Sequence, residues 1–212
     1  YLIKPVNPKQ ILLSLKKIID SNRLISEKVT SNYRQGFIEL SNRVNDRLNE
    51  EGWKELYKDL VYWELELSKS GEESMQEILI SQKQEANKNF AKHIKNNYEN
   101  WIDDPDYGPI LSHNVFAKKV APYLRRNERP TVLMVIDNLR FDQWKFLQSF
   151  FTSGFDLKNE DMYYAIVPTA TQYARNAFFA GLMPLDIQKR FGKKWVSDDE
   201  EGGKNMYEEE FL

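Results

Sequence analysis

The sequence predicts an α/β domain with a parallel sheet, preceded by an all-α helical bundle. Three observations lead to this prediction. Residues 132–136 form a short apolar run that leads directly into Asp137, and residues 163–167 form a second such run, which Pro168 ends. Short apolar runs with β-branched residues are typical of strands buried in a parallel sheet. Residues 30–102 instead carry apolar side chains at every third or fourth position, which is the period of an amphipathic helix.

The composition is that of a globular protein of about one or two domains. The chain has 212 residues and a formal net charge of −2, so it offers no basic field that would recruit nucleic acid. It contains no cysteine, which excludes disulfides and fits a reducing compartment. No apolar run suits a membrane helix or a signal peptide, so we expect a soluble, cytoplasmic protein. Because the chain starts at Tyr1 rather than Met and stops without a closing element, we expect it to be part of a longer protein.

Residues 1–24 combine a strand, the dipeptide Lys4-Pro5 and an amphipathic helix that Asn7 and Pro8 are suited to begin. This order resembles the C-terminal end of a response-regulator receiver domain. The resemblance implies that Lys4 contacts the aspartyl phosphate and that the Lys4–Pro5 peptide bond is cis. It also implies that the phosphorylated aspartate lies outside this chain. The alternative is a strand, an ordinary turn and a solvated lysine.

Residues 25–109 are predicted to form a linker bundle of about three helices. Gly52 and Gly71 mark the breaks between these helices, and the turn-rich residues 103–109 mark the end of the bundle. Residues 110–212 then form the α/β domain.

Asp137 and Thr171 are the candidate site residues. Asp137 ends the first predicted strand, where open α/β sheets place ligands, and Thr171 opens a helical stretch after the second. If the strands are neighbours, this carboxylate and this hydroxyl meet, as metal-assisted phosphoryl transfer requires: the carboxylate holds a divalent cation that activates the hydroxyl as a nucleophile. A structural interpretation stays open for each. Asp137 can be a helix N-cap unless Asn138 takes that position, and Thr169 or Thr171 can cap the second helix.

The segment from Pro168 to Pro184 carries a proline, Thr-x-Thr, a helical stretch and Gly-Leu-x-Pro. It resembles the nucleophile segment of phosphodiesterases of the alkaline phosphatase superfamily. The sequence Val-Ile-Asp-Asn-Leu-Arg-x-Asp around Asp137 resembles the PglZ branch of that superfamily. A receiver end, a helical linker and a PglZ start, in this order, resemble the PorX-like response regulators, which are linked to type IX secretion in Bacteroidetes.

The resemblance implies a phosphodiesterase with two zinc ions. Asp137 would bind one zinc, shared with Thr171, and Thr171 would be the nucleophile. A helix start suits this role, because the amide groups and the helix dipole there stabilise an alkoxide and a bound phosphate. Thr169 matches the nucleophile position less well. His93 and His113 match no ligand of the family, and we expect both to be structural or solvated.

Four further residues are predicted near the pocket: Arg140, Asp142, Arg175 and Asn176. Arg175 or Asn176 could hold a phosphate oxygen, and surface positions agree equally with the pattern. The acidic residues 198–201 are expected to form a solvated loop, because sites for hard cations need spaced, convergent oxygens rather than a contiguous run.

These features predict a two-component signalling enzyme whose receiver domain governs a zinc-dependent phosphodiesterase acting on nucleotides or oligonucleotides. Expected partners are a sensor histidine kinase, a secretion-machinery component or sigma factor, and a second copy of the chain when the receiver is phosphorylated. The alternative is a non-catalytic scaffold that binds secretion or transcription partners. A DNA-binding regulator is disfavoured, because the helical region carries Glu and Asp throughout and shows no basic recognition helix.

Overall fold

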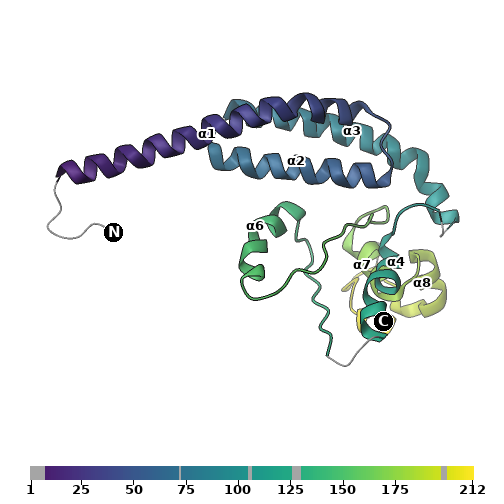
Figure 1. Cartoon of the computed structure of the whole chain (residues 1–212). Coiled ribbons are helices and arrows are strands. Elements are labelled where there is room, and N and C mark those ends of the chain that lie inside the picture. The colour runs from purple at the N-terminus through teal and green to yellow at the C-terminus, as the bar shows by residue number, and fades with distance from the viewer. Residues whose placement is uncertain (1–7, 72, 105–106, 126–129, 197–199) are drawn as a thin grey trace. The chain divides into compact units, whose positions relative to one another are not determined.

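The structure, a computed structural model, describes residues 8–71, 73–104, 107–125, 130–196 and 200–212. The chain divides into two compact units (Figure 1). The first unit runs to Glu99 and includes Leu139–Asp156, and the second consists of Asn100–Asn138 and Leu157–Leu212. Of the helices in the described ranges, none has both the length and the apolar composition needed to cross a membrane.

Three long helices make up most of the first unit: α1 (Pro8–Asn45), α2 (Glu50–Ser70) and α3 (Glu73–Asp103), whose last turn belongs to the second unit. Asn49 is the N-cap of α2, and its side chain accepts a hydrogen bond of 2.9 Å from the backbone amide three residues on. Gly71 ends α2 with a φ of 70°, a conformation that favours glycine. The three predicted helices are therefore present, and the first break lies before Gly52 rather than at it.

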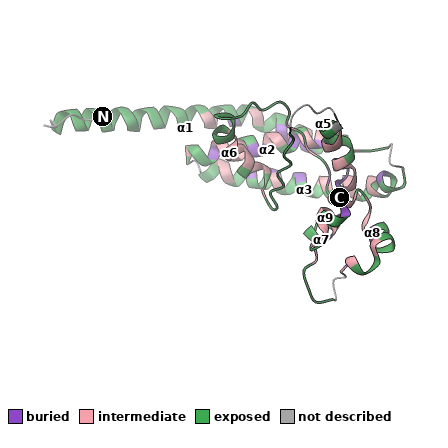
Figure 2. Ribbon diagram, turned by 90° about the horizontal axis from the view of Figure 1, so that it is seen from below, coloured by how far each residue is buried: buried purple, intermediate pink, exposed green. Residues whose placement is uncertain are grey.

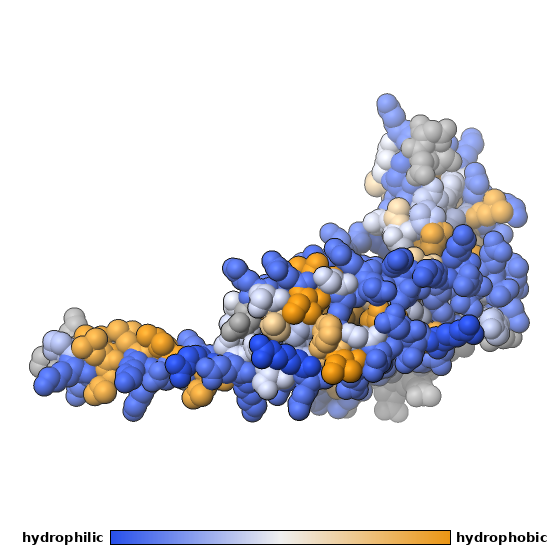
Figure 3. Space-filling model, turned by 90° about the horizontal axis from the view of Figure 1, so that it is seen from above, coloured by the Kyte–Doolittle hydropathy of each residue, from blue (hydrophilic) through white to orange (hydrophobic). Residues whose placement is uncertain are grey.

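Helix α1 is longer than the sequence predicted. The amphipathic helix expected after Asn7 and the first bundle helix are one continuous helix of 38 residues. Its N-terminal half continues past the ends of α2 and α3 and is almost entirely exposed (Figures 1 and 2). Apolar side chains gather on this half (Figure 3), among them Leu12, Ile18 and Ile19, which are 67%, 57% and 64% exposed. The predicted apolar stripe is thus real, but it has no covering layer among the described residues.

The core of the bundle combines apolar packing with one buried polar side chain. Its buried members are Tyr33, Leu40, Val44, Trp53, Leu56, Leu60, Leu67, Leu79 and Ala86. The Tyr33 hydroxyl donates a hydrogen bond of 2.8 Å to Oε1 of the buried Gln82. Nε2 of Gln82 donates in turn to the carbonyl of Phe37 at 3.1 Å and to Oγ of Ser41 at 2.8 Å. Gln82 therefore ties α3 to α1 inside the core, and burial raises the pKa of Tyr33 to about 12.

Helix α6 (Phe141–Thr152) belongs to the first unit, where the ring of Phe141 lies 6.0 Å from that of Tyr57 on α2. Its N-cap is Arg140, whose backbone amide donates to Gln143 Oε1 at 3.0 Å. Neither Asp137 nor Asn138 takes the capping position that the sequence left open for them. Asn138 lies instead in a turn with a φ of 59°, which asparagine tolerates better than most residues.

The second unit is built from short elements. These are α4 (Ser112–Val115), the π-helix η1 (Phe116–Val120), α5 (Ala121–Arg125), α7 (Thr171–Ala180), α8 (Pro184–Phe191), the 3₁₀-helix η2 (Gly192–Lys194) and α9 (Glu208–Phe211). Its most deeply buried apolar residues are Leu111, Ile166, Ala177 and Ile187. The ring of Trp101, from the last turn of α3, lies 5.3 Å from that of Tyr164. Gly108 has to be a glycine, because its φ is 97° and a Cβ would come within 2.3 Å of Trp101.

The predicted parallel sheet is wrong, because the described residues contain no strand and no sheet. Residues 132–136 are not helical, and each of their side chains is between 42% and 83% exposed. The second predicted strand, residues 163–167, makes a single isolated parallel bridge, between Leu111 and Tyr164. The amide of Tyr164 donates to the carbonyl of Ile110 at 2.9 Å.

The predicted strands do not form a sheet because they do not pair with each other. A buried parallel strand needs hydrogen-bonding partners along its length and apolar layers on both faces. Residues 163–167 take their partners from residues 110–112, where α4 begins: besides the bridge, the amide of Ile166 donates to Oγ of Ser112 at 3.1 Å. Residues 132–136 have the composition of a strand, but the described residues give them no such partners. Lys4 and the Lys4–Pro5 bond lie outside the described residues, within which the cis peptide bond is Val167–Pro168.

The link between Tyr33 and Gln82 gives a test of the bundle. We expect Tyr33→Phe to lower the free energy of unfolding by about 1–3 kcal/mol, because the buried Gln82 Oε1 loses its donor while the packing volume hardly changes. Urea unfolding followed by circular dichroism measures the difference. Tyr62→Phe is the matched control, because Tyr62 is 54% exposed and should leave stability nearly unchanged. Equal stabilities of the two variants would contradict the assigned role of the hydrogen bond.

Candidate functional site

Thr171 is the first residue of α7 and is exposed. The N-cap before it is Ala170, with a φ of −59° and a ψ of 141°, and no side chain caps the helix there. The capping role that the sequence left open for Thr169 and Thr171 is therefore taken by neither. The first amide groups of a helix have no acceptor within it, so the Thr171 hydroxyl lies where backbone N–H groups suit an anion.

Arg175 joins the two predicted site segments. It lies four residues after Thr171 and hence on the same face of α7. Its Nη1 donates to Oδ2 of Asp137 at 3.0 Å, and its Nε and Nη2 donate to the two carboxylate oxygens of Glu208, both at 2.5 Å. The hydrogen bonds to Glu208 first, and the one to Asp137 after them, raise the pKa of Arg175. One guanidinium group on α7 thus holds two carboxylates from distant parts of the sequence.

The structure therefore brings Asp137 to the helix that Thr171 begins, although the sheet that was expected to do so does not form. The Asp137 side chain is 48% exposed, so it is accessible from solvent. Glu208 is the contact residue that sequence reasoning missed. It lies in the run Glu208-Glu209-Glu210, where three identical side chains offer no signal as to which one faces the site.

Asn176 braces the segment that follows α8 rather than facing a ligand. It is almost fully buried, and its Nδ2 donates to the carbonyl of Lys204 at 3.0 Å. Its Oδ1 accepts from Nδ2 of Asn205 at 3.0 Å, and the same nitrogen lies 3.2 Å from the carbonyl oxygen of Thr171. Of the two residues that the sequence offered for a phosphate oxygen, Asn176 is committed to structure, and Arg175 has the chemistry for such a contact.

Arg140 and Asp142 pair with each other at the start of α6. Nε and Nη2 of Arg140 donate to the two carboxylate oxygens of Asp142 at 2.9 and 2.7 Å. This hydrogen bonding holds the pKa of Asp142 below its usual value. Both residues belong to the first unit, whereas Arg175 belongs to the second.

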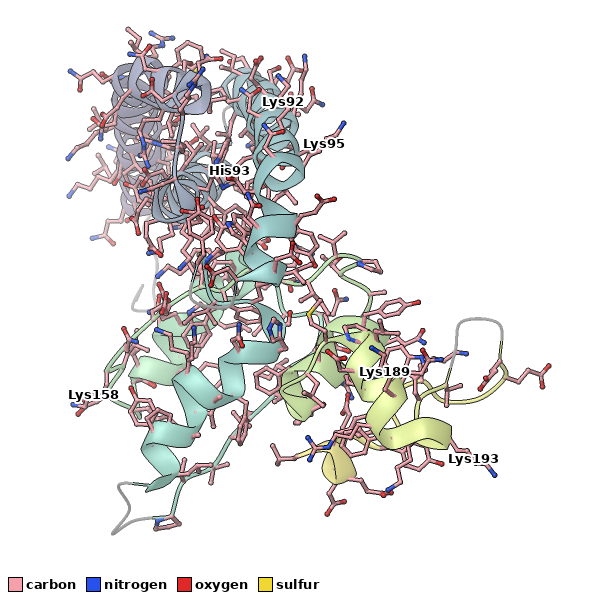
Figure 4. All side chains as sticks on the ribbon, turned by 90° about the vertical axis from the view of Figure 1, so that its right-hand side faces the viewer. Lys92, His93, Lys95, Lys158, Lys189 and Lys193 are labelled. Atoms are coloured by element: carbon pink, nitrogen blue, oxygen red, sulfur yellow. The ribbon has the colours of Figure 1, made fainter. Side chains whose placement is uncertain are left out.

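His93 lies on α3 within the bundle, with ring contacts to Trp53 at 5.9 Å and Phe90 at 6.4 Å. Figure 4 shows it on the side of α3 that faces the other helices, whereas Lys95 points away. Burial lowers the pKa of His93, although Glu50, at 3.9 Å, acts in the opposite direction. His113 is on α4, where burial first and Lys118 second lower its pKa.

The described residues do not form a zinc site by themselves. Zinc takes about four ligands in structural sites, and about three protein ligands in catalytic ones. Asp137 and Thr171 offer two groups, and Asp137 already accepts a hydrogen bond from Arg175. Within the described ranges, no group of three or more His, Cys, Asp or Glu side chains could hold a metal. Of the acidic run 198–201, residues 198 and 199 lie outside these ranges, and Glu200 and Glu201 are exposed.

Comparison with known families gives two matches, while a search of curated proteins found none. Residues 23–102 match the PorX response regulator linker domain, and residues 115–212 match the BREX system PglZ alkaline phosphatase-like domain. The first match contains most of the three-helix bundle, and the second contains Asp137, Thr171 and Arg175. Neither covers residues 1–22, where the receiver end is predicted. The chain therefore matches a PorX-like regulator, in which a linker domain precedes a PglZ alkaline phosphatase-like domain.

Proposed function

We propose that the PglZ part of this regulator hydrolyses phosphodiesters, with Thr171 as the nucleophile. The observation that carries the proposal is the place of Thr171 as the exposed first residue of α7, within the residues that match an alkaline phosphatase-like domain. A domain of this kind indicates a hydrolase of the phosphatase type. Asp137, held beside α7 by Arg175, is the second residue assigned to the site.

The reaction follows from the chemistry of a hydroxyl at a helix start. Oγ of Thr171 attacks phosphorus, the bond from phosphorus to one ester oxygen breaks, and the hydroxyl proton leaves with the released alcohol. The product is a phosphodiester that links Thr171 to the remaining group. Water then attacks phosphorus, the bond to Oγ breaks, and a phosphomonoester leaves while the threonine hydroxyl is restored. The first-turn amides and the dipole of α7 favour the negative charge throughout.

A metal is part of the proposal, because alkaline phosphatase-like domains are typically metal-dependent. We propose zinc, with about two ions in the intact protein. Asp137 and Thr171 are the two groups available here, so zinc binding would need further ligands from outside the described residues. The metal would lower the pKa of the nucleophile and offset the charge of the phosphoryl group. The proposed substrates are nucleotides or short oligonucleotides in the cytoplasm.

The signalling role is proposed from the match to a regulator linker. A sensor histidine kinase would phosphorylate a receiver domain, and the helical linker would pass the signal to the PglZ domain. A secretion-machinery component of the type IX system, or a sigma factor, would receive the output.

A non-catalytic scaffold is the second candidate, and two observations favour it. The described residues hold no group of three candidate metal ligands, and a carboxylate of the site is engaged by Arg175. In that case phosphorylation would expose a surface for a secretion or transcription partner. Hydrolysis by the intact protein decides between the two candidates.

The nucleophile can be tested by release of nitrophenol from a generic phosphodiester. In the intact protein we expect Thr171→Ala to reduce turnover by about a thousandfold or more, because the attacking atom is lost. Thr169→Ala is the matched control: it removes the same atoms two residues earlier, before α7 begins, and should cause a smaller loss. Full activity of Thr171→Ala would show that the nucleophile is elsewhere. Equal losses, with both variants unfolded by circular dichroism, would assign the threonines a structural role.

The metal can be tested by elemental analysis of the purified intact protein. We expect about two zinc ions per chain, and we expect Asp137→Ala to lose one of them together with the activity, because the cation leaves with its ligand. Thr171→Ala should retain most of the metal, since the hydroxyl is one ligand among several. A protein without zinc that is also not stabilised by added zinc would refute the proposed metal site.

Self-association can be tested by light scattering of the intact protein, with and without a phosphoryl mimic. Two aromatic side chains of the linker, Tyr33 and Trp53, are buried in the bundle core. The first half of α1 instead leaves apolar side chains exposed, among them Leu12, Ile18 and Ile19. Such a stripe favours pairing with another apolar surface. We expect the mass to double with the mimic. A monomer mass under both conditions would rule out the phosphorylation-dependent dimer.

A further inference from the structure

The segment Lys204–Phe211 lies along α7 and occupies its one arginine. We infer that Arg175 is a phosphate-binding residue of the site and that Glu208 competes with the phosphate for it, so that this segment has to move aside when substrate binds. The inference rests on the proposed phosphodiesterase function and adds a contact that holds the site closed. Its basis is that Glu208 accepts hydrogen bonds from Nε and Nη2 of Arg175, the same donors that a phosphate would use.

The guanidinium edge formed by Nε and Nη2 presents two parallel N–H groups, and this fork fits two oxygens of either a carboxylate or a phosphate. Glu208 fills both positions at 2.5 Å. The third nitrogen, Nη1, holds Asp137 at 3.0 Å. With both carboxylates in place, the edge that a phosphate would use is taken. Without Glu208, one carboxylate remains on Arg175, and the edge can accept a second anion.

The position of Arg175 suits a phosphate that Thr171 attacks. The two residues are one helical turn apart on the same face of α7. Side chains on a helix lean toward its N-terminus, which favours a position of the guanidinium toward the turn that begins at Thr171. A phosphoryl group on the Nε and Nη2 edge would therefore approach the hydroxyl and the first-turn amides together. Glu208 places a carboxylate where that group would bind.

The contacts that hold the segment in place are mostly polar. Asn205 donates to the carbonyl of Thr171 and to Asn176, and Glu210 pairs with Lys194. The one buried apolar anchor is Phe211, whose ring lies 4.9 Å from that of Phe191. When the segment leaves α7, these groups exchange their hydrogen bonds for hydrogen bonds to water, so the net cost of losing each contact is smaller than the strength of the bond itself. The segment can therefore leave α7 without opening the core around Leu111 and Ile166.

Binding of inorganic phosphate by the intact protein tests this inference. The variants are Glu208→Gln and the matched control Glu209→Gln, which removes the same charge from the exposed neighbouring residue. We expect Glu208→Gln to bind phosphate about tenfold more tightly than wild type in isothermal titration calorimetry, because the amide is a weaker competitor for the guanidinium. Glu209→Gln should bind within about twofold of wild type, since exposed charges are screened by salt. The double variant Glu208→Gln with Arg175→Lys should lose the gain, because lysine keeps the charge but not the fork.

Two results would overturn the inference. Equal affinities of Glu208→Gln and Glu209→Gln would mean that net charge alone sets phosphate binding. A gain that survives Arg175→Lys, with the fold verified by circular dichroism, would place the phosphate elsewhere.

The outcome is separate from that of the proposed function, because phosphate binding needs no turnover. If Thr171→Ala abolishes hydrolysis while Glu208→Gln leaves phosphate affinity unchanged, the function stands and the competition fails. Tighter phosphate binding by Glu208→Gln, in a protein that hydrolyses no phosphodiester, would support the competition and contradict the proposed enzymatic function.

Discussion

The arrangement of the candidate site depends on one cation, the guanidinium group of Arg175. Asp137 comes from the turn that follows an exposed segment without regular secondary structure, and Glu208 comes from a helix of four residues. Neither carrier is a rigid element, so the direction of each carboxylate is set by its partner more than by its own backbone. The ion pairs are partly shielded, with side-chain exposures of 31% for Arg175 and 16% for Glu208. Their contribution is therefore larger than that of a fully solvated pair.

The bundle shows a different way of fixing an arrangement. Apolar side chains at helical spacing are interchangeable enough that α1 could slide or rotate against α3 with modest loss of packing. Gln82 restricts this movement, because its side-chain amide finds hydrogen-bonding partners on α1 only in the observed register. These partners are Tyr33, Phe37 and Ser41. A buried polar group with all of its partners thus selects one register from several that the apolar surface would allow.

The sequence correctly predicted the features that depend on interactions between residues close together in the chain. The periodic apolar side chains of the bundle, the break at Gly71 and the helix start at Thr171 all depend on residues within one or two turns, and all three are present. The sheet depended on which segments pair, and residues 163–167 took their hydrogen bonds from Ile110 and Ser112. The role of Glu208 depended on a contact with a residue 33 positions away. Composition carries no information about such pairings, which explains why the sheet was wrongly predicted and Glu208 was missed.

The length of α1 has a mechanical consequence. It has 38 residues and no proline beyond its first position, so it is a single stiff rod of about 57 Å, at 1.5 Å per residue. A rod of this kind has no hinge between its exposed N-terminal half and Tyr33. A displacement of the exposed end is therefore carried into the bundle core, where Val29 packs and Tyr33 donates its hydrogen bond to Gln82. The helix thus connects its exposed N-terminal half rigidly to the polar contact between Tyr33 and Gln82 in the core.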